Sequence, residues 1–151
     1  LAVELSRGLD ENPSTAERGA LSRRIRAGLV VSVHCDSHAV ATVHGSSAYY
    51  LRTNAVNRIL AGALLKRAPL EMQGRRPIEA LEHPPKGDWA YLRRSWVVLH
   101  EHDPATPAAL FECGYLSNDH DREFLTSPIG QAKVATGIVQ ACLDWAQEQK
   151  T

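Results

Sequence analysis

The stretch that decides the fold reads Ala108-Ala109-Leu110-Phe111-Glu112-Cys113-Gly114-Tyr115-Leu116-Ser117-Asn118. Four apolar residues precede a single carboxylate, Glu112, and the stretch then breaks at Gly114 and ends on a Ser-Asn pair typical of turns and helix caps. The pattern predicts a buried strand that ends in a polar turn. A carboxylate is costly to bury without a partner, so Glu112 is either a candidate for chemistry or a side chain that faces solvent from an edge strand.

A second apolar run, Leu29-Val30-Val31-Ser32-Val33, lacks the alternation of a half-exposed strand. It is typical of a strand that is buried on both faces of a parallel sheet. A polar cluster follows it directly: His34, Cys35, Asp36, Ser37 and His38. Ligands bind at the carboxyl ends of strands in open α/β sheets, so this cluster is well placed for a site. For His34, the alternative is a histidine with a purely structural role.

Length and composition favour one globular domain over residues 1–151. Hydrophobic residues make up 44% of the 151 residues, and 17 basic residues balance 17 acidic ones, which gives no indication of nucleic-acid binding. No apolar run approaches the roughly 20 residues needed to span a bilayer, and no signal-peptide pattern stands at the start. Three cysteines are too few for a disulfide framework and leave the cellular compartment open. We expect a monomer.

The rest of the chain alternates between strand and helix patterns, which predicts an α/β fold of three layers: a mostly parallel, twisted sheet with helices on both faces. Further strands are expected at residues 1–5, 46–51 and 96–100. Helices are expected at 14–27, with an apolar face on Ala16, Ala20, Leu21 and Ile25, from Asn54 to before Pro69, at 119–125, and from Ser127 onward. The long segment 70–94, with Trp89 and Tyr91, is expected to be a loop that lines a groove or packs on the body.

Several of these segments together resemble the zinc-dependent N-acetylmuramoyl-L-alanine amidases of the type 3 catalytic family. Phe111 to Asn118 is similar to that family's Val-Glu-Val-Gly-Phe-Leu-Ser-Asn signature, and Val31 to Asp36 is similar to its Ser-Ile-His-Ala-Asn strand end. Weaker matches occur in the expected order at Glu4 to Arg7, Arg18, Gly45 to Tyr50 and Val98-Leu99. The resemblance covers nearly the whole chain, and its specificity comes from the order of the six segments.

The resemblance implies hydrolysis of the amide between N-acetylmuramic acid and L-alanine in peptidoglycan, by a bacterial autolysin secreted to the periplasm or the cell wall. It implies a zinc cofactor, with His34 as a metal ligand and Glu112 as the catalytic residue that takes a proton from water and returns it to the departing amine. His100 and Asp36 are implied as contacts for the peptidoglycan or muropeptide substrate, with a second shell around the metal as another role for Asp36.

The family's first strand and helix, which carry its first zinc histidine and its glutamate ligand, have no counterpart in this sequence. We expect these ligands to lie upstream of Leu1. The alternative is a metal-less relative that binds peptidoglycan or regulates its turnover. His38, His44, His100 and His102 are possible substitute ligands, although none has a spacing that argues for it. A third class is another α/β metallohydrolase that acts on a different amide.

Cys35 and Cys113 each follow one of the two main candidate residues. Because neighbouring residues of a strand point to opposite faces, both thiols should face away from His34 and Glu112, and we expect both to be buried. A disulfide between them is an open alternative if their strands are adjacent.

Overall fold

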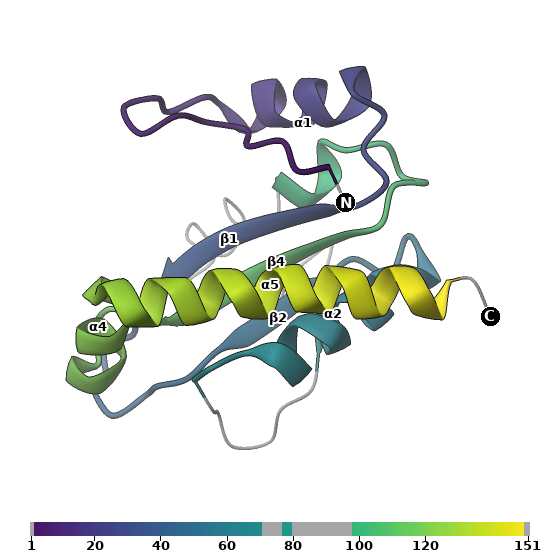
Figure 1. The fold of residues 1–151 in the computed structure, drawn as a ribbon. Helices are drawn as coiled ribbons and strands as arrows, with labels where there is room; N and C mark the ends of the chain where they lie inside the picture. The colour runs from purple at the N-terminus through teal and green to yellow at the C-terminus, as the bar shows by residue number, and fades with distance from the viewer. Residues whose placement is uncertain (1, 71–76, 80–97, 150–151) are drawn as a thin grey trace, which may run out of the picture.

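The computed structural model describes residues 2–70, 77–79 and 98–149, and Figure 1 shows their arrangement. The elements follow one another in the order α1 (Thr15–Arg24), β1 (Val30–Asp36), β2 (Ser47–Tyr50), α2 (Ala55–Arg67), β3 (Ile78–Glu79), β4 (Ala108–Tyr115), α4 (Asp119–Thr126) and α5 (Pro128–Glu148). In this part of the chain, no helix is both long enough and apolar enough to cross a membrane.

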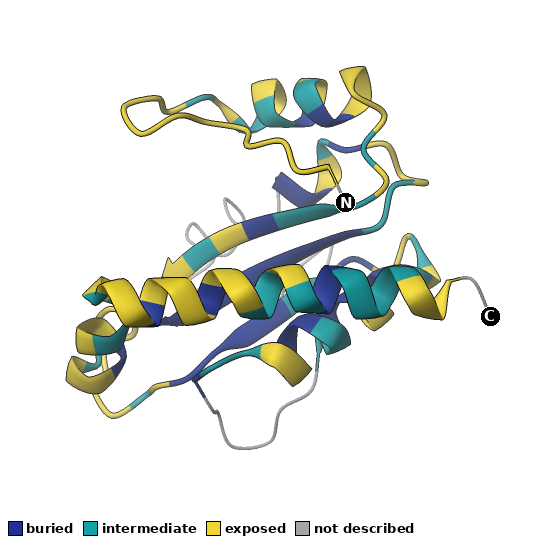
Figure 2. Ribbon diagram, viewed as in Figure 1, coloured by how far each residue is buried: buried dark blue, intermediate teal, exposed yellow. Residues whose placement is uncertain are grey.

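The strands form one mixed sheet in the order β1-β4-β2-β3. The β1–β4 and β2–β3 pairs are parallel, and the β2–β4 pair is antiparallel. The predicted α/β class with a mostly parallel sheet is therefore confirmed. All eight residues of β4 are buried, because it lies between two other strands and is covered on both faces (Figure 2).

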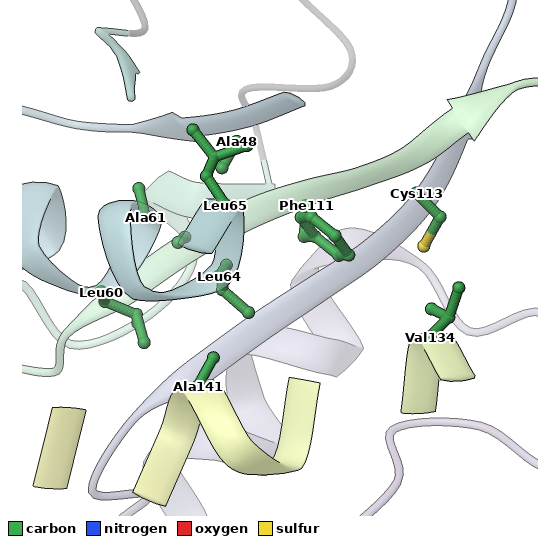
Figure 3. Close-up of a cluster of buried hydrophobic side chains, with 10 residues drawn as sticks. Ala48, Leu60, Ala61, Leu64, Leu65, Phe111, Cys113, Val134 and Ala141 are labelled. Atoms are coloured by element: carbon green, nitrogen blue, oxygen red, sulfur yellow. The ribbon is translucent and has the colours of Figure 1, made fainter. Parts of the chain in front are cut away.

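Successive side chains of β4 point to opposite faces of the sheet. Ala109, Phe111 and Cys113 face the larger core cluster, which includes Leu60, Leu64 and Ala141 from helices α2 and α5 (Figure 3). Ala108 and Leu110 face a smaller cluster with Leu51, Val98 and Leu99. Glu112 continues this second series, so its side chain lies on the face away from α2 and α5.

Local capping signals explain where the helices begin. Ser14 forms the predicted capping box with Glu17 at the start of α1. Asn54 accepts a hydrogen bond from the Val56 amide at the start of α2, and Ser127 accepts one from the Gly130 amide at the start of α5. The expected positions of these helices are confirmed to within a few residues.

Gly114 allows β4 to pass close to the segment around Leu70 and to helix α4. A Cβ atom at this position would lie 2.7 Å from Leu70 Cδ1 and 3.0 Å from Asp121 Oδ2, on a backbone with φ of +157°. Asp121 is completely buried and accepts hydrogen bonds from the Gly45 amide at 2.6 Å and the Tyr115 amide at 3.0 Å. A side chain at Gly114 would therefore disturb the carboxylate that joins three segments.

We expect Gly114→Ala to lower the free energy of unfolding by about 1–3 kcal/mol, through overpacking and backbone strain. Gly62→Ala is the matched control, because a Cβ there meets only Pro77 Cγ at 3.7 Å, within helix α2. This control should be neutral or slightly stabilising. Denaturant unfolding measures both changes, and equal stabilities of Gly114→Ala and the wild type would refute the packing argument.

Several predicted details are wrong. Residues 2–5 form no strand, and Val3 and Leu5 are exposed. Residues 98–100 are helical, and Val98 and Leu99 pack into the same core cluster, whereas successive side chains of a strand would point to opposite faces. Trp96 lies outside the described residues, as do Trp89, Tyr91 and most of the segment 70–94, but Ile78 and Glu79 of that segment form strand β3.

Helix α1 also differs from its predicted packing. Its buried residues are Gly19 and Ser22, whereas Ala16, Ala20 and Ile25 are exposed. Gly19 lets the α1 backbone approach Glu101 closely, and Ser22 Oγ lies 2.7 Å from His102 Nδ1. A glycine contact and a polar contact thus hold α1 in place where the apolar pattern predicted a hydrophobic stripe.

Candidate active site

The structure brings Glu112 and His34 together on one face of the sheet. The two residues are direct partners in the parallel register of β1 and β4. Paired residues of neighbouring strands point to the same face, so both side chains lie on the face away from α2 and α5. Strand β1 continues to Asp36, so His34, Cys35 and Asp36 belong to the strand and do not follow it as expected.

Glu112 is a buried carboxyl group with spare hydrogen-bonding capacity. The residue is 5% exposed, and its Oε2 atom has no hydrogen-bond partner among the described residues. Burial raises the pKa of Glu112 to about 8, with smaller contributions from the nearby charges of Asp36 and Cys35. The expectation that Glu112 is buried is confirmed, and the solvent-facing alternative is wrong. Such a carboxyl group is close to the pKa that suits proton transfer near neutral pH.

His34 is half-buried and electrically neutral near pH 7. Its Nε2 atom lies 2.8 Å from Ser32 Oγ, two residues earlier on the same face of β1. Burial lowers the pKa of His34, and the positive charge of Arg18 lowers it further. A neutral imidazole has a free lone pair, which is the form that binds metals and accepts protons.

Asp36 lies two residues beyond His34 and is buried. Its carboxylate accepts a hydrogen bond from the Ser37 amide at 2.7 Å, and its backbone carbonyl accepts one from the Leu116 amide at 2.8 Å. The Tyr115 side chain is also hydrogen-bonded to Asp36. Asp36 therefore ties the end of β1 to the end of β4 and places a negative charge near Glu112.

The other candidate histidines are dispersed. His100 is exposed on the helical turn 98–100. His38 and His44 lie in the loop between β1 and β2, where both are exposed, and His102 is buried against Ser22 of α1. Among the described residues, no group of three or more His, Cys, Asp or Glu side chains is arranged to hold a metal ion. These residues supply one suitable imidazole beside Glu112 and do not by themselves fit a catalytic zinc ion.

Strand β2 adds two residues that the sequence patterns did not single out as part of a site. Ser47 is buried and pairs with Glu112 in the antiparallel register of β2 and β4. Tyr49 follows on the same face, and burial raises its pKa, with further contributions from the charges of Asp36 and Glu112. Only the register of β2 against β4 could have indicated that Ser47 and Tyr49 lie near Glu112, and a single sequence does not specify that register.

A cavity of about 440 Å³ lies elsewhere, beside helix α4. It does not include Glu112 or His34. Its lining residues are His44, Pro69, Leu70, Asn118, His120 and Asp121. In the described part of the chain, the candidate site is therefore an arrangement on the sheet face and not this cavity.

Comparisons with known proteins place this chain in a family. The model of the N-acetylmuramoyl-L-alanine amidase family matches residues 1–144. The chain is 25% identical over 146 residues to the N-acetylmuramoyl-L-alanine amidase CwlM of Mycobacterium tuberculosis, covering 93% of this chain and 32% of that protein. It is 28% identical over 120 residues to the probable cell wall amidase LytH of Staphylococcus saprophyticus, covering 78% and 35% of the two chains. The chain thus spans about a third of the length of these curated relatives.

A solved structure shares the fold. The catalytic domain of CwlV, an N-acetylmuramoyl-L-alanine amidase from Paenibacillus polymyxa var. colistinus, superposes with a TM-score of 0.76 at 23% identity, covering 97% of this chain and 73% of that domain. At this identity the likeness concerns the fold alone. The family model matches residues 1–144, which is nearly the whole chain. This chain therefore belongs to the N-acetylmuramoyl-L-alanine amidase family.

Proposed function

We propose that this chain is the amidase-like catalytic domain of a cell-wall hydrolase. Its reaction is hydrolysis of the amide between the lactyl group of N-acetylmuramic acid and L-alanine of the stem peptide in peptidoglycan, in the periplasm or the cell wall. The observation that carries the proposal is the pairing of buried Glu112, whose Oε2 atom has no hydrogen-bond partner among the described residues, with His34 on one sheet face. Membership of the amidase family supports the same reaction.

Glu112 is the proposed proton carrier of the reaction. In its ionised form, its free oxygen can take a proton from the attacking water, and the resulting carboxyl group can return that proton to the departing amine of L-alanine. A pKa of about 8 keeps both forms accessible near neutral pH. Asp36 contributes by holding the ends of β1 and β4 together, and its negative charge favours the protonated form of Glu112.

Substrate contacts are proposed for Asp36 and His100. Asp36 lies on the same strand face as His34, two residues further along β1, at the end of the sheet where the scissile amide would sit. His100 is exposed and free to meet a large polymeric substrate at the surface. We propose that His100 contributes to substrate binding and not to the chemical step. Replacement of His100 by alanine should therefore raise KM more than it lowers kcat.

We also propose zinc dependence, with His34 as one ligand and the remaining ligands outside the described residues. A zinc ion held there would polarise the scissile carbonyl and lower the pKa of water near it. The neutral imidazole of His34 supports this role. The described residues do not complete the ligand set by themselves.

The purified protein should bind about one zinc ion per chain, and His34→Ala should weaken zinc binding by at least tenfold, because the imidazole would be a direct ligand. Metal analysis after dialysis against buffers of defined free zinc measures this. His120→Ala is the matched control, since His120 is exposed on α4 and should leave zinc binding unchanged. Equal zinc binding by wild type and His34→Ala would remove His34 from the ligand set.

A second candidate function is a metal-less relative that binds peptidoglycan or regulates its turnover. The absence of a three-ligand cluster in the described part of the chain favours it. Incubation of purified peptidoglycan with the zinc-supplemented protein separates the two functions. The amidase should release new amino termini that begin with L-alanine. Binding to the wall material without new amino termini would support the metal-less relative and reject the amidase.

A further inference from the structure

The register of β1 and β4 brings two cysteines face to face. His34 pairs with Glu112, and Asp36 pairs with Tyr115, so the single residue Cys35 of β1 lies opposite Cys113 and Gly114 of β4. A local irregularity in the register lies at this point. Paired residues of neighbouring strands point to the same face of the sheet, so the side chains of Cys35 and Cys113 lie on one face. The two cysteines are therefore neighbours across adjacent strands.

The two thiols differ in their access to solvent. Cys35 is exposed, contrary to the expectation that it is buried, whereas Cys113 is 3% exposed at the edge of the larger core cluster near Val134 (Figure 3). Cys35 is exposed because β1 is an edge strand of the described sheet, where neighbouring Val33 is also 52% exposed. The Cys35 thiol is thus accessible to a reagent in solution, whereas the Cys113 thiol is buried next to it.

The backbone spacing suits a covalent bond between them. Neighbouring strands lie roughly 4.7–4.9 Å apart, and disulfides join residues with Cα atoms about 4.4–6.8 Å apart. The register already places the two residues opposite each other on the same face of the sheet. A disulfide would require only small adjustments within the irregular part of the register.

We propose that Cys35 and Cys113 form a reversible intramolecular disulfide that ties β1 to β4 one residue beyond His34 and Glu112. The oxidant is a small-molecule disulfide. The Cys35 thiolate attacks one sulfur of this disulfide, forming a mixed disulfide and releasing one thiol. Cys113 then displaces the second thiol from Cys35 and forms the protein disulfide. The protein loses two protons and two electrons, which leave with the two small thiols.

The bond would act on both stability and geometry. It closes a long loop from residue 35 to residue 113, and so reduces the conformational freedom of the unfolded chain. It would also fix the spacing of the two strands at the position of the candidate site. This inference goes beyond the proposed hydrolysis and does not depend on it, because its readouts are thiol content, linkage and thermal stability.

The test compares protein reduced with dithiothreitol and protein equilibrated with oxidised glutathione. Free thiols under denaturing conditions should fall from three to one, and peptide mapping should find Cys35 linked to Cys113, with Cys142 free. The thermal midpoint should rise on oxidation by about 5–15 °C. The Cys35→Ser protein should form no intramolecular disulfide after treatment with oxidised glutathione, so its two remaining thiols should stay free or carry glutathione. Its thermal midpoint should not rise on oxidation.

Cys142→Ser is the matched control, because Cys142 is buried on α5 and has no part in the proposed pair. It should show the same linkage and the same rise in midpoint as the wild type. Glutathione that stays attached to Cys35 without displacement by Cys113 would overturn the proposal. So would a cross-link that forms but lowers the midpoint, because the strands would then not be positioned for it.

Discussion

Glu112→Gln should slow hydrolysis of a muropeptide by about 10²–10⁴-fold, the contribution typical of a positioned acid–base group. The amide keeps the shape and hydrogen-bonding capacity of the carboxyl group but cannot take a proton from water or return it to the amine. The loss should appear in kcat with little change in KM, because binding of the substrate does not depend on proton transfer. Steady-state kinetics on a purified muropeptide measure the effect.

Two further variants show whether position or charge matters. Glu112→Asp keeps the carboxyl group but withdraws it from the paired position beside His34, so its rate should fall between those of the wild type and Glu112→Gln. Glu123→Gln removes an exposed carboxylate of α4 and should leave the rate unchanged. A Glu112→Gln protein with wild-type kcat would show that Glu112 is not the proton carrier. The description of the fold would not be affected.

The same substitution should change how stability depends on pH. The folded-state pKa of Glu112 is about 8, above the value of 4.5 expected for the exposed group. Between these values the unfolded chain releases the proton while the folded chain retains it, so stability falls as pH rises from about 4.5 to about 8. The full loss, about 5 kcal/mol, is present above pH 8 and absent below pH 4.

Glu112→Gln removes this titration, so the variant should be more stable than the wild type above pH 8 and similar to it at pH 4. His34 and His102 have lowered pKa values, so they favour stability as pH rises, but they are present in both proteins. Denaturant unfolding across this pH range, without added zinc, gives the difference. Parallel curves for the two proteins would mean that Glu112 is not a perturbed carboxyl group.

The strongest patterns in the sequence predicted the main body of the fold. The apolar run that became β4 is buried throughout, and the helical period after Ser127 became α5, because in each case local propensity and burial agree. The errors lie where they disagree. Val98 and Leu99 have the composition of a strand but pack as a helical turn, and α1 packs through Gly19 and Ser22. Contacts between distant segments decide these cases, and a single sequence does not reveal them.

The candidate site was only partly predictable. The resemblance implied that His34 and Glu112 act at one site, and their paired register places them side by side, although both lie inside their strands and not beyond the strand ends. The position of Ser47 opposite Glu112 depends on the register of an antiparallel strand, and the exposure of Cys35 depends on its place at the edge of the sheet. Neither feature leaves a periodic signal in the sequence.

The most direct test of the account is digestion of a purified muropeptide in heavy-oxygen water with zinc present, followed by mass spectrometry of the products. Hydrolysis at the proposed bond should place one heavy oxygen in the lactyl carboxylate of N-acetylmuramic acid and free the amine of L-alanine. The Glu112→Gln protein should yield far less of both products. An intact muropeptide after incubation with the wild type, or a heavy oxygen at another peptide bond, would contradict the account.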